Sequence, residues 1–146
     1  MSNAKSVKPV ERTLNIGDKT YIIKFTLNSF IVLEDLYGSI EEAMKKLEGE
    51  KVIDEKTGLV VMEPLKDDNG QVVLDEDGNE KTVEKRNLSF KVIRNVLYAG
   101  LISAQPDITT EDVGNFEIKD FKDVMKSLMD ALTGSLPQAK EENQKN

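Results

Sequence analysis

The stretch NLSFKVIRNVLYAGLISAQ, residues Asn87 to Gln105, is the longest apolar-rich run in the chain. Its apolar residues recur mostly at three- and four-residue spacing, which places them on one broad face of a helix. These residues are Leu88, Val92, Ile93, Val96, Leu97, Leu101, Ile102 and Ala104. Tyr98, Ala99 and Gly100 extend the apolar surface around the cylinder. We therefore predict a central helix over about 88–104, with other elements packed on more than one side.

Polar residues and small residues refine the role of this helix. Lys91, Arg94 and Asn95 interrupt its first half, which favours a buried helix of a soluble protein over a membrane span of the same length. Gly100 has no side chain, and we expect it to let a neighbouring helix, the one predicted at 29–37, approach closely.

The composition excludes several classes of chemistry. The chain has 146 residues without Cys or His, so disulfides, thiol nucleophiles and histidine general bases or metal ligands are excluded. A net charge of −7 opposes nonspecific nucleic-acid binding, which needs a basic face. The N-terminus, MSNAKSVKPVERT, lacks the apolar segment of a secretory signal. We expect no cofactor, metal, nucleic acid or membrane as a partner.

Residues 11–49 predict a β-hairpin followed by two helices. Alternation of β-branched and aromatic residues with polar ones indicates strands at about 12–16 and 19–26, joined by the turn pair Gly17-Asp18. Residues that favour helix caps or the left-handed conformation mark the ends of the two helices. They are Asn28, Gly38, Ser39 and Gly49.

The segment at about 50–86 differs from its surroundings. It holds eleven acidic and six basic residues, a net charge of −5. Its short apolar pieces are separated by Thr57-Gly58, Asn69-Gly70 and Asp77-Gly78, which are turn signals. We interpret it as an acidic insertion, either a β-hairpin or a solvated loop. The acid-rich residues 75–80 lack the ligand spacing of a calcium-binding EF-hand, so a charged turn is the favoured interpretation there.

A last long helix is predicted from Ile118 to Leu132, after a short helix capped by Thr109 or Thr110. Its apolar stripe is typical of a helix that faces the core, and a partner-binding face is the alternative. The flexible side chains of Met125 and Met129 suit varied partners. The candidate partner-binding residues are Phe121, Val124, Met125, Leu128, Met129, Leu132 and Leu136.

Together these elements predict an α+β fold that is predominantly α. An N-terminal β-hairpin is expected to pack on a four- to five-helix bundle, with the acidic segment at about 50–86 inserted between helices. We expect one domain over residues 1–137, in which 87–137 supplies the central and C-terminal helices. The polar residues 138–146 are predicted to be disordered. No nucleophile elbow, P-loop or dinucleotide-binding glycine pattern is present in the sequence, so we expect a protein that is not an enzyme.

Three short pieces of the sequence carry a family resemblance. They are Leu97-Tyr98-Ala99-Gly100-Leu101, Asp107-Ile108-Thr109-Thr110-Glu111-Asp112-Val113 and the corner Leu36-Tyr37-Gly38-Ser39. In the chain the corner comes first, after the strand hairpin, and the other two pieces follow. With this arrangement they resemble the tail assembly chaperones of long-tailed, siphovirus-type bacteriophages, prophages and gene transfer agents. The resemblance covers about 12–48 and 88–133, and the acidic segment lies outside it.

The resemblance implies a function without catalysis. Such proteins keep the long tape measure protein soluble and help to recruit tail tube subunits around it in the host bacterial cytoplasm. They are absent from the finished virion, and many have a longer form made by a programmed frameshift. The implied partners are the tape measure protein and the tail tube protein, with self-association as a further candidate. The alternatives are a structural tail component, such as a tube or completion protein, and a small prophage adaptor module.

Overall fold

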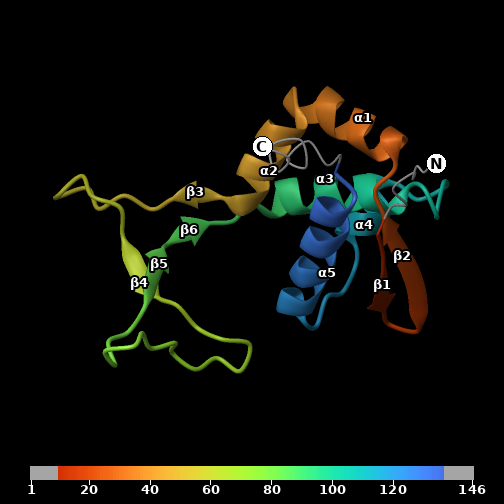
Figure 1. Cartoon of the computed structure of the whole chain (residues 1–146). Coiled ribbons are helices and arrows are strands. Elements are labelled where there is room, and N and C mark those ends of the chain that lie inside the picture. Colours follow the sequence, from red (N-terminus) through yellow and green to blue (C-terminus); the bar gives the residue numbers. More distant parts are fainter. Residues whose placement is uncertain (1–9, 137–146) are drawn as a thin grey trace, which may run out of the picture. The chain divides into compact units, whose positions relative to one another are not determined.

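A computed structural model describes residues 10–136 of the chain (Figure 1). The chain divides into two units. The first comprises the residues up to Ala43 and those from Phe90 onward, and the second comprises Met44–Ser89. The described part holds five helices and three small antiparallel strand pairs, so the predicted α+β fold class is confirmed. The predicted tail at 138–146 lies outside the described residues.

The first unit begins with the predicted β-hairpin. Strands β1 (Glu11–Ile16) and β2 (Lys19–Lys24) pair antiparallel, and Gly17 takes the positive φ of 63° that the tight turn requires. Leu14 and Ile23 are buried on one face. On the edge of β2 that does not pair with β1, the Gln105 side chain satisfies the backbone groups of Ile22. Its amide oxygen accepts from the Ile22 N–H at 2.8 Å, and its amide nitrogen donates to the Ile22 carbonyl at 3.1 Å.

Helix α1 (Leu27–Tyr37) begins earlier than predicted, because the sequence indicated Asn28 as the residue that precedes the helix. Its N-cap is Thr26 instead of Asn28, because the Ser29 hydroxyl accepts from the Thr26 N–H at 3.0 Å. The strand β2 therefore stops at Lys24, short of the predicted residue 26. Gly38 ends the helix as predicted, with φ of 94° and its N–H donating to the Glu34 carbonyl at 2.7 Å.

Helix α2 (Ile40–Glu48) follows immediately. The Ser39 hydroxyl accepts from the Glu42 N–H at 3.1 Å, which is the predicted N-cap contact. Gly49 ends the helix with φ of 91°.

Helix α3 (Phe90–Leu101) is the centre of the first unit, as its sequence predicts. It contacts α1, β2, α4 (Thr110–Gly114) and α5 (Phe121–Gly134). It is shorter than the predicted 88–104. Its start is delayed because Asn87 pairs with another strand. Beyond Leu101 the chain forms a turn, and the Gln105 N–H donates to the Leu101 carbonyl at 2.9 Å.

Gly100 packs differently from the prediction. A Cβ at this position would lie 2.8 Å from the Phe25 ring and 3.0 Å from the Ile23 side chain. The close neighbour is therefore the end of the β-hairpin, and not helix α1. The reason is that α3 rests directly on β2 at this point.

The second unit contains a β-arm, which we define as residues 50–87. At its base β3 (Glu50–Lys51) pairs with β6 (Arg86–Asn87), and further along β4 (Met62–Pro64) pairs with β5 (Thr82–Glu84). The strands are only two or three residues long, so most of the arm consists of turns and single bridges. The arm thus combines short strand pairs with long turns, which are features of both alternatives interpreted from the sequence.

Two closed triads of backbone hydrogen bonds hold the arm together. In the first, Val52 donates to Lys85, Lys85 to Val61 and Val61 to Val52, at 2.8–2.9 Å. The second repeats this pattern with Leu65, Lys81 and Val73, also at 2.8–2.9 Å. Each triad satisfies both the donor and the acceptor of three residues, so the arm branches without leaving these backbone groups unpaired.

Candidate functional site

Three of the seven predicted partner-binding residues are buried. Leu128 and Leu132 have no exposed surface and Val124 is 5% exposed, because α5 packs on β1, β2 and α3. These residues therefore form core, and the prediction that they offer an open surface is wrong for them. The remaining candidates are half-buried: Phe121, Met125, Met129 and Leu136.

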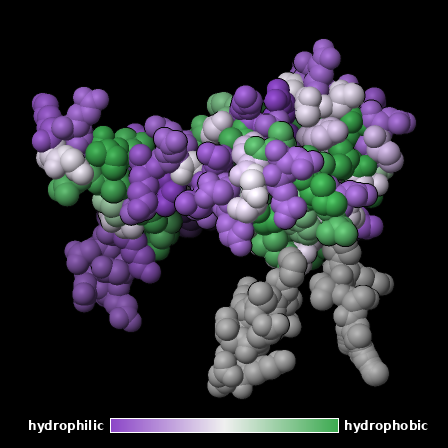
Figure 2. All heavy atoms as spheres, turned by 90° about the horizontal axis from the view of Figure 1, so that it is seen from above, coloured by the Kyte–Doolittle hydropathy of each residue, from purple (hydrophilic) through white to green (hydrophobic). Residues whose placement is uncertain are grey.

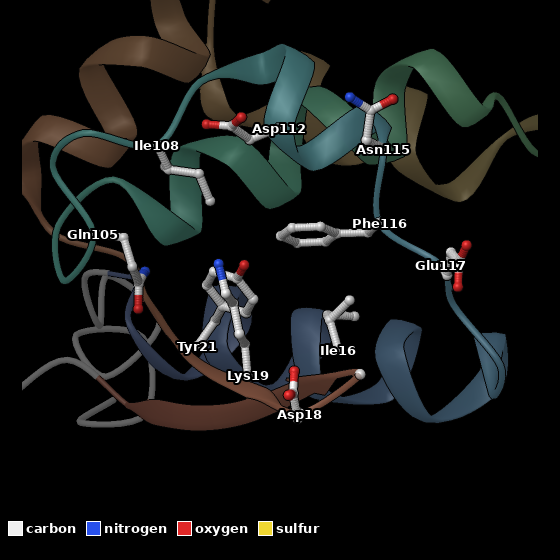
Figure 3. A pocket seen from close by; sticks show the side chains of 11 residues that line it. Ile16, Asp18, Lys19, Tyr21, Gln105, Ile108, Asp112, Asn115, Phe116 and Glu117 are labelled. Atoms are coloured by element: carbon white, nitrogen blue, oxygen red, sulfur yellow. The ribbon is translucent and has the colours of Figure 1, made fainter.

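A cleft of about 560 Å³ lies between the β1–β2 turn and α4 (Figure 3). The rings of Tyr21 and Phe116 face one another in its middle, with centroids 4.9 Å apart. Its charged lining residues are Asp18, Lys19, Asp112 and Glu117. These carboxylates are spread around the cleft, and its lining includes no nucleophile paired with a base, so it has no catalytic arrangement that we recognise.

A second hollow, which we call the Phe90 groove, lies between α3, α4 and α5 and measures about 320 Å³. Its lining is mainly apolar and aromatic, and the only charged residues in it are Lys91 and Arg94. Phe90 is 73% exposed although it contacts Phe121 edge-on, with ring centroids 5.8 Å apart. An exposed aromatic ring beside two cations is a favourable place for a partner to bind.

Arg94 is held in place from within the first unit. Its Nε and Nη2 groups donate to Asn95 Oδ1 at 3.2 and 2.9 Å. The buried Asn95 side chain in turn donates to the Tyr37 hydroxyl at 3.1 Å. The guanidinium is therefore oriented at the groove before any ligand arrives. In the sequence, Lys91, Arg94 and Asn95 were interpreted only as interruptions of an apolar helix. The close spacing of the two cations could have indicated a positively charged binding surface.

The arm exposes more apolar surface than its size leads us to expect. None of its residues is buried, and five large apolar side chains in it are exposed by 37–68%. They are Ile53, Leu59, Met62, Leu74 and Val83. Figure 2 shows hydrophobic surface on the arm, at the left of the view, bordered by hydrophilic side chains. Such a surface can be covered by a partner.

The acidic charge of the arm is confined to one part of it. Residues 66–80 hold six acidic residues and one Lys, a net charge of −5. The rest of the arm, 50–65 and 81–87, holds five acidic and five basic residues and is neutral. The arm therefore has a neutral apolar part, around Leu59 and Met62, and an acidic part that includes Leu74.

Similar turns shape the acidic part. The Asp67 carboxylate accepts from the backbone N–H groups of Asn69 and Gln71 at 2.9 and 3.0 Å. The Asp75 carboxylate accepts from Asp77 and Asn79 at 2.9 Å each. Both are charged hairpin turns of the kind interpreted from the sequence. Over residues 10–136, no cluster of three or more Asp or Glu side chains is arranged to hold a metal ion.

The comparisons with known proteins identify no relative. No protein-family model, curated protein or solved structure matches this chain. Within the part of the chain that the structure describes, no helix has the length and apolar character needed to cross a membrane.

Proposed function

We propose that this protein is a non-catalytic tail assembly chaperone, which keeps a tape measure protein soluble and helps to recruit tail tube subunits around it. The sequence motifs at Leu97–Leu101 and Asp107–Val113 suggest the family. The observation that carries the proposal is the exposed apolar surface of the arm, in a segment without a buried residue.

The neutral part of the arm is the surface that we assign to the tape measure protein. Leu59 is 68% exposed, and Ile53 and Met62 are each 49% exposed. Covering such side chains removes apolar area from water, at about 25 cal/mol per Å². The charged residues around them keep the free protein soluble until the partner arrives.

Rigidity supports the same assignment. The Asp54 carboxylate accepts from the Lys56 N–H at 2.8 Å, and the Gly58 N–H donates to the Asp54 carbonyl at 2.7 Å. The turn that carries Leu59 is therefore ordered before binding. A preorganised surface loses less conformational entropy when it captures a long apolar chain.

Co-expression with a tape measure protein from the same genome tests this proposal. The wild-type chain is expected to bring the tape measure protein into the soluble fraction and to co-purify with it. A variant with Leu59→Asp and Met62→Asp should lose most of this effect. Both side chains are exposed, so the variant should keep the fold, which circular dichroism and the unfolding midpoint would verify.

The matched control is Leu27→Asp on α1, because Leu27 is 75% exposed but lies outside the arm. It should leave the solubility of the tape measure protein unchanged. If the wild-type chain has no effect on solubility, the proposed function is wrong. If the arm variant works as well as the wild type, the chaperone surface lies elsewhere on the molecule.

A further inference from the structure

We propose that the acidic part of the arm, residues 66–80, docks in the Phe90 groove of a second copy of this chain. The inference rests on the shape and charge of these two surfaces and does not depend on the proposed function. The neutral part of the arm around Leu59 takes no part in it.

The groove supplies an apolar floor and positive charge. The rings of Phe90, Phe116 and Phe121 line it, and both of its charged residues are basic. In a protein with a net charge of −7, a local site with only cations selects a partner that carries carboxylates. Arg94 adds a planar donor group whose position is fixed by Asn95.

The arm supplies the complement. Leu74 is 56% exposed and stands at the start of the second acidic turn. It bridges to Glu80 across this turn, and Glu76 and Asp77 lie at its tip. None of these three carboxylates forms an ion pair within the described residues, so all three are available to cations of another molecule. The turn thus presents one apolar side chain beside several free carboxylates.

Preorganisation favours the contact. The two backbone N–H groups bound by Asp75 fix the turn, and the second hydrogen-bond triad, through Val73 and Lys81, fixes its two ends. On the other side, the Phe90–Phe121 ring contact and the Arg94–Asn95 bonds fix the groove. Little ordering is needed when the two surfaces meet.

The contact joins two different surfaces, so it is heterologous. Each pair of molecules leaves one free acidic turn and one free groove, and further copies can add at both ends. The small size of the surfaces implies a weak interaction, with a dissociation constant on the order of 10–100 μM. The assembly should weaken as salt screens the charges.

Sedimentation velocity of the full chain, over a concentration series that spans this range, tests the proposal. The wild type should sediment faster as its concentration rises, without a plateau at two copies. A groove variant with Phe90→Ser and Lys91→Glu, and an arm variant with Leu74→Ser and Glu76→Lys, should each associate at least ten-fold more weakly. All four substituted side chains are exposed, so the variants should remain folded.

Mixing the two variants is the decisive measurement. The groove variant keeps its acidic turn and the arm variant keeps its groove, so an equimolar mixture should form two-copy complexes and stop there. Lys122→Glu, which makes the same charge change on α5 outside the groove, should leave the association unchanged. Arg94 is not substituted because it also bonds the buried Asn95.

Three results would overturn the proposal: a wild type that stays monomeric over the series, variants that associate like the wild type, and a mixture that remains monomeric. An arm that occupies the groove of its own chain would give the first result. The variants leave Ile53, Leu59 and Met62 intact, so they should still keep the tape measure protein soluble. Failure here is therefore distinguishable from failure of the proposed function.

Discussion

The first unit and the arm are stabilised by different kinds of interaction. In the first unit, apolar side chains from β1, β2, α1, α3 and α5 are buried together, and several of them have no exposed surface. The arm buries no residue, and it is organised by turns, short strand pairs and two backbone hydrogen-bond triads. One region is stabilised by the hydrophobic effect, and the other by the pairing of backbone groups and by glycines in left-handed turns.

This difference separates stability from recognition. Substitutions in the first unit should change the free energy of unfolding, because they act on close packing. Substitutions of exposed arm side chains should change association with partners and leave unfolding nearly unchanged. The arm can therefore vary its surface chemistry without endangering the fold of the first unit.

The largest effect is expected from Leu128→Ala in α5. The side chain has no exposed surface, and its truncation should lower the free energy of unfolding by about 2–5 kcal/mol. Leu59→Ala in the arm removes the same atoms from a side chain that is 68% exposed, and should cost less than about 0.5 kcal/mol. Urea unfolding followed by helical circular dichroism would measure both. Equal losses would remove the distinction between the two regions.

A smaller effect is expected where α3 rests on the hairpin. In Gly100→Ala the new Cβ would lie 2.8 Å from the Phe25 ring. Overpacking should outweigh the gain in helix propensity and lower stability by about 1–2 kcal/mol. Gly114→Ala is the matched control, because its Cβ would meet only Arg94, at 3.5 Å. Thermal unfolding of the two variants should differ in sign or clearly in size, and identical midpoints would contradict the packing described for α3.

The smallest effect is expected from Asp75→Ala. It removes the acceptor for the N–H groups of Asp77 and Asn79. The free energy of opening this turn should therefore fall by about 0.5–1.5 kcal/mol. Amide hydrogen exchange at Asn79 should accelerate, while exchange in α3 stays unchanged. Glu76→Ala, in the same turn, should leave the exchange rate at Asn79 unchanged. Faster exchange throughout α3 would show that the arm is coupled to the core of the first unit.

Local signals in the sequence predicted much of the fold. The hairpin, the glycine ends of α1 and α2 and the central position of α3 follow from alternation, turn chemistry and helical spacing. The register at Asn87 could not be predicted, because it depends on a pairing with Glu50 that is distant in sequence. The neighbour predicted for Gly100 was wrong for the same reason. A glycine allows another element to approach closely, but it does not specify which element that is.

The candidate surfaces were harder to predict than the fold. The α5 stripe identified a face that must be covered, but periodicity cannot say whether the chain itself or a partner covers it. The structure buries Leu128 and Leu132. Conversely, Phe90 was counted within an apolar run, and only the arrangement of α3, α4 and α5 shows that it is left exposed. The roles of Asp67 and Asp75 were missed, although an Asp three residues before a turn glycine is a recognisable signal.

The pairing of Glu50 with Asn87 has a consequence for how this chain can change over time. The arm begins and ends at two residues that lie opposite each other in one short ladder. Closing a loop costs entropy that grows only with the logarithm of its length, and doubling the length adds about 0.6 kcal/mol. The chain can therefore lengthen, shorten or exchange the residues beyond this ladder in single steps. Such changes would leave the buried side chains of the helices and of the N-terminal hairpin in place.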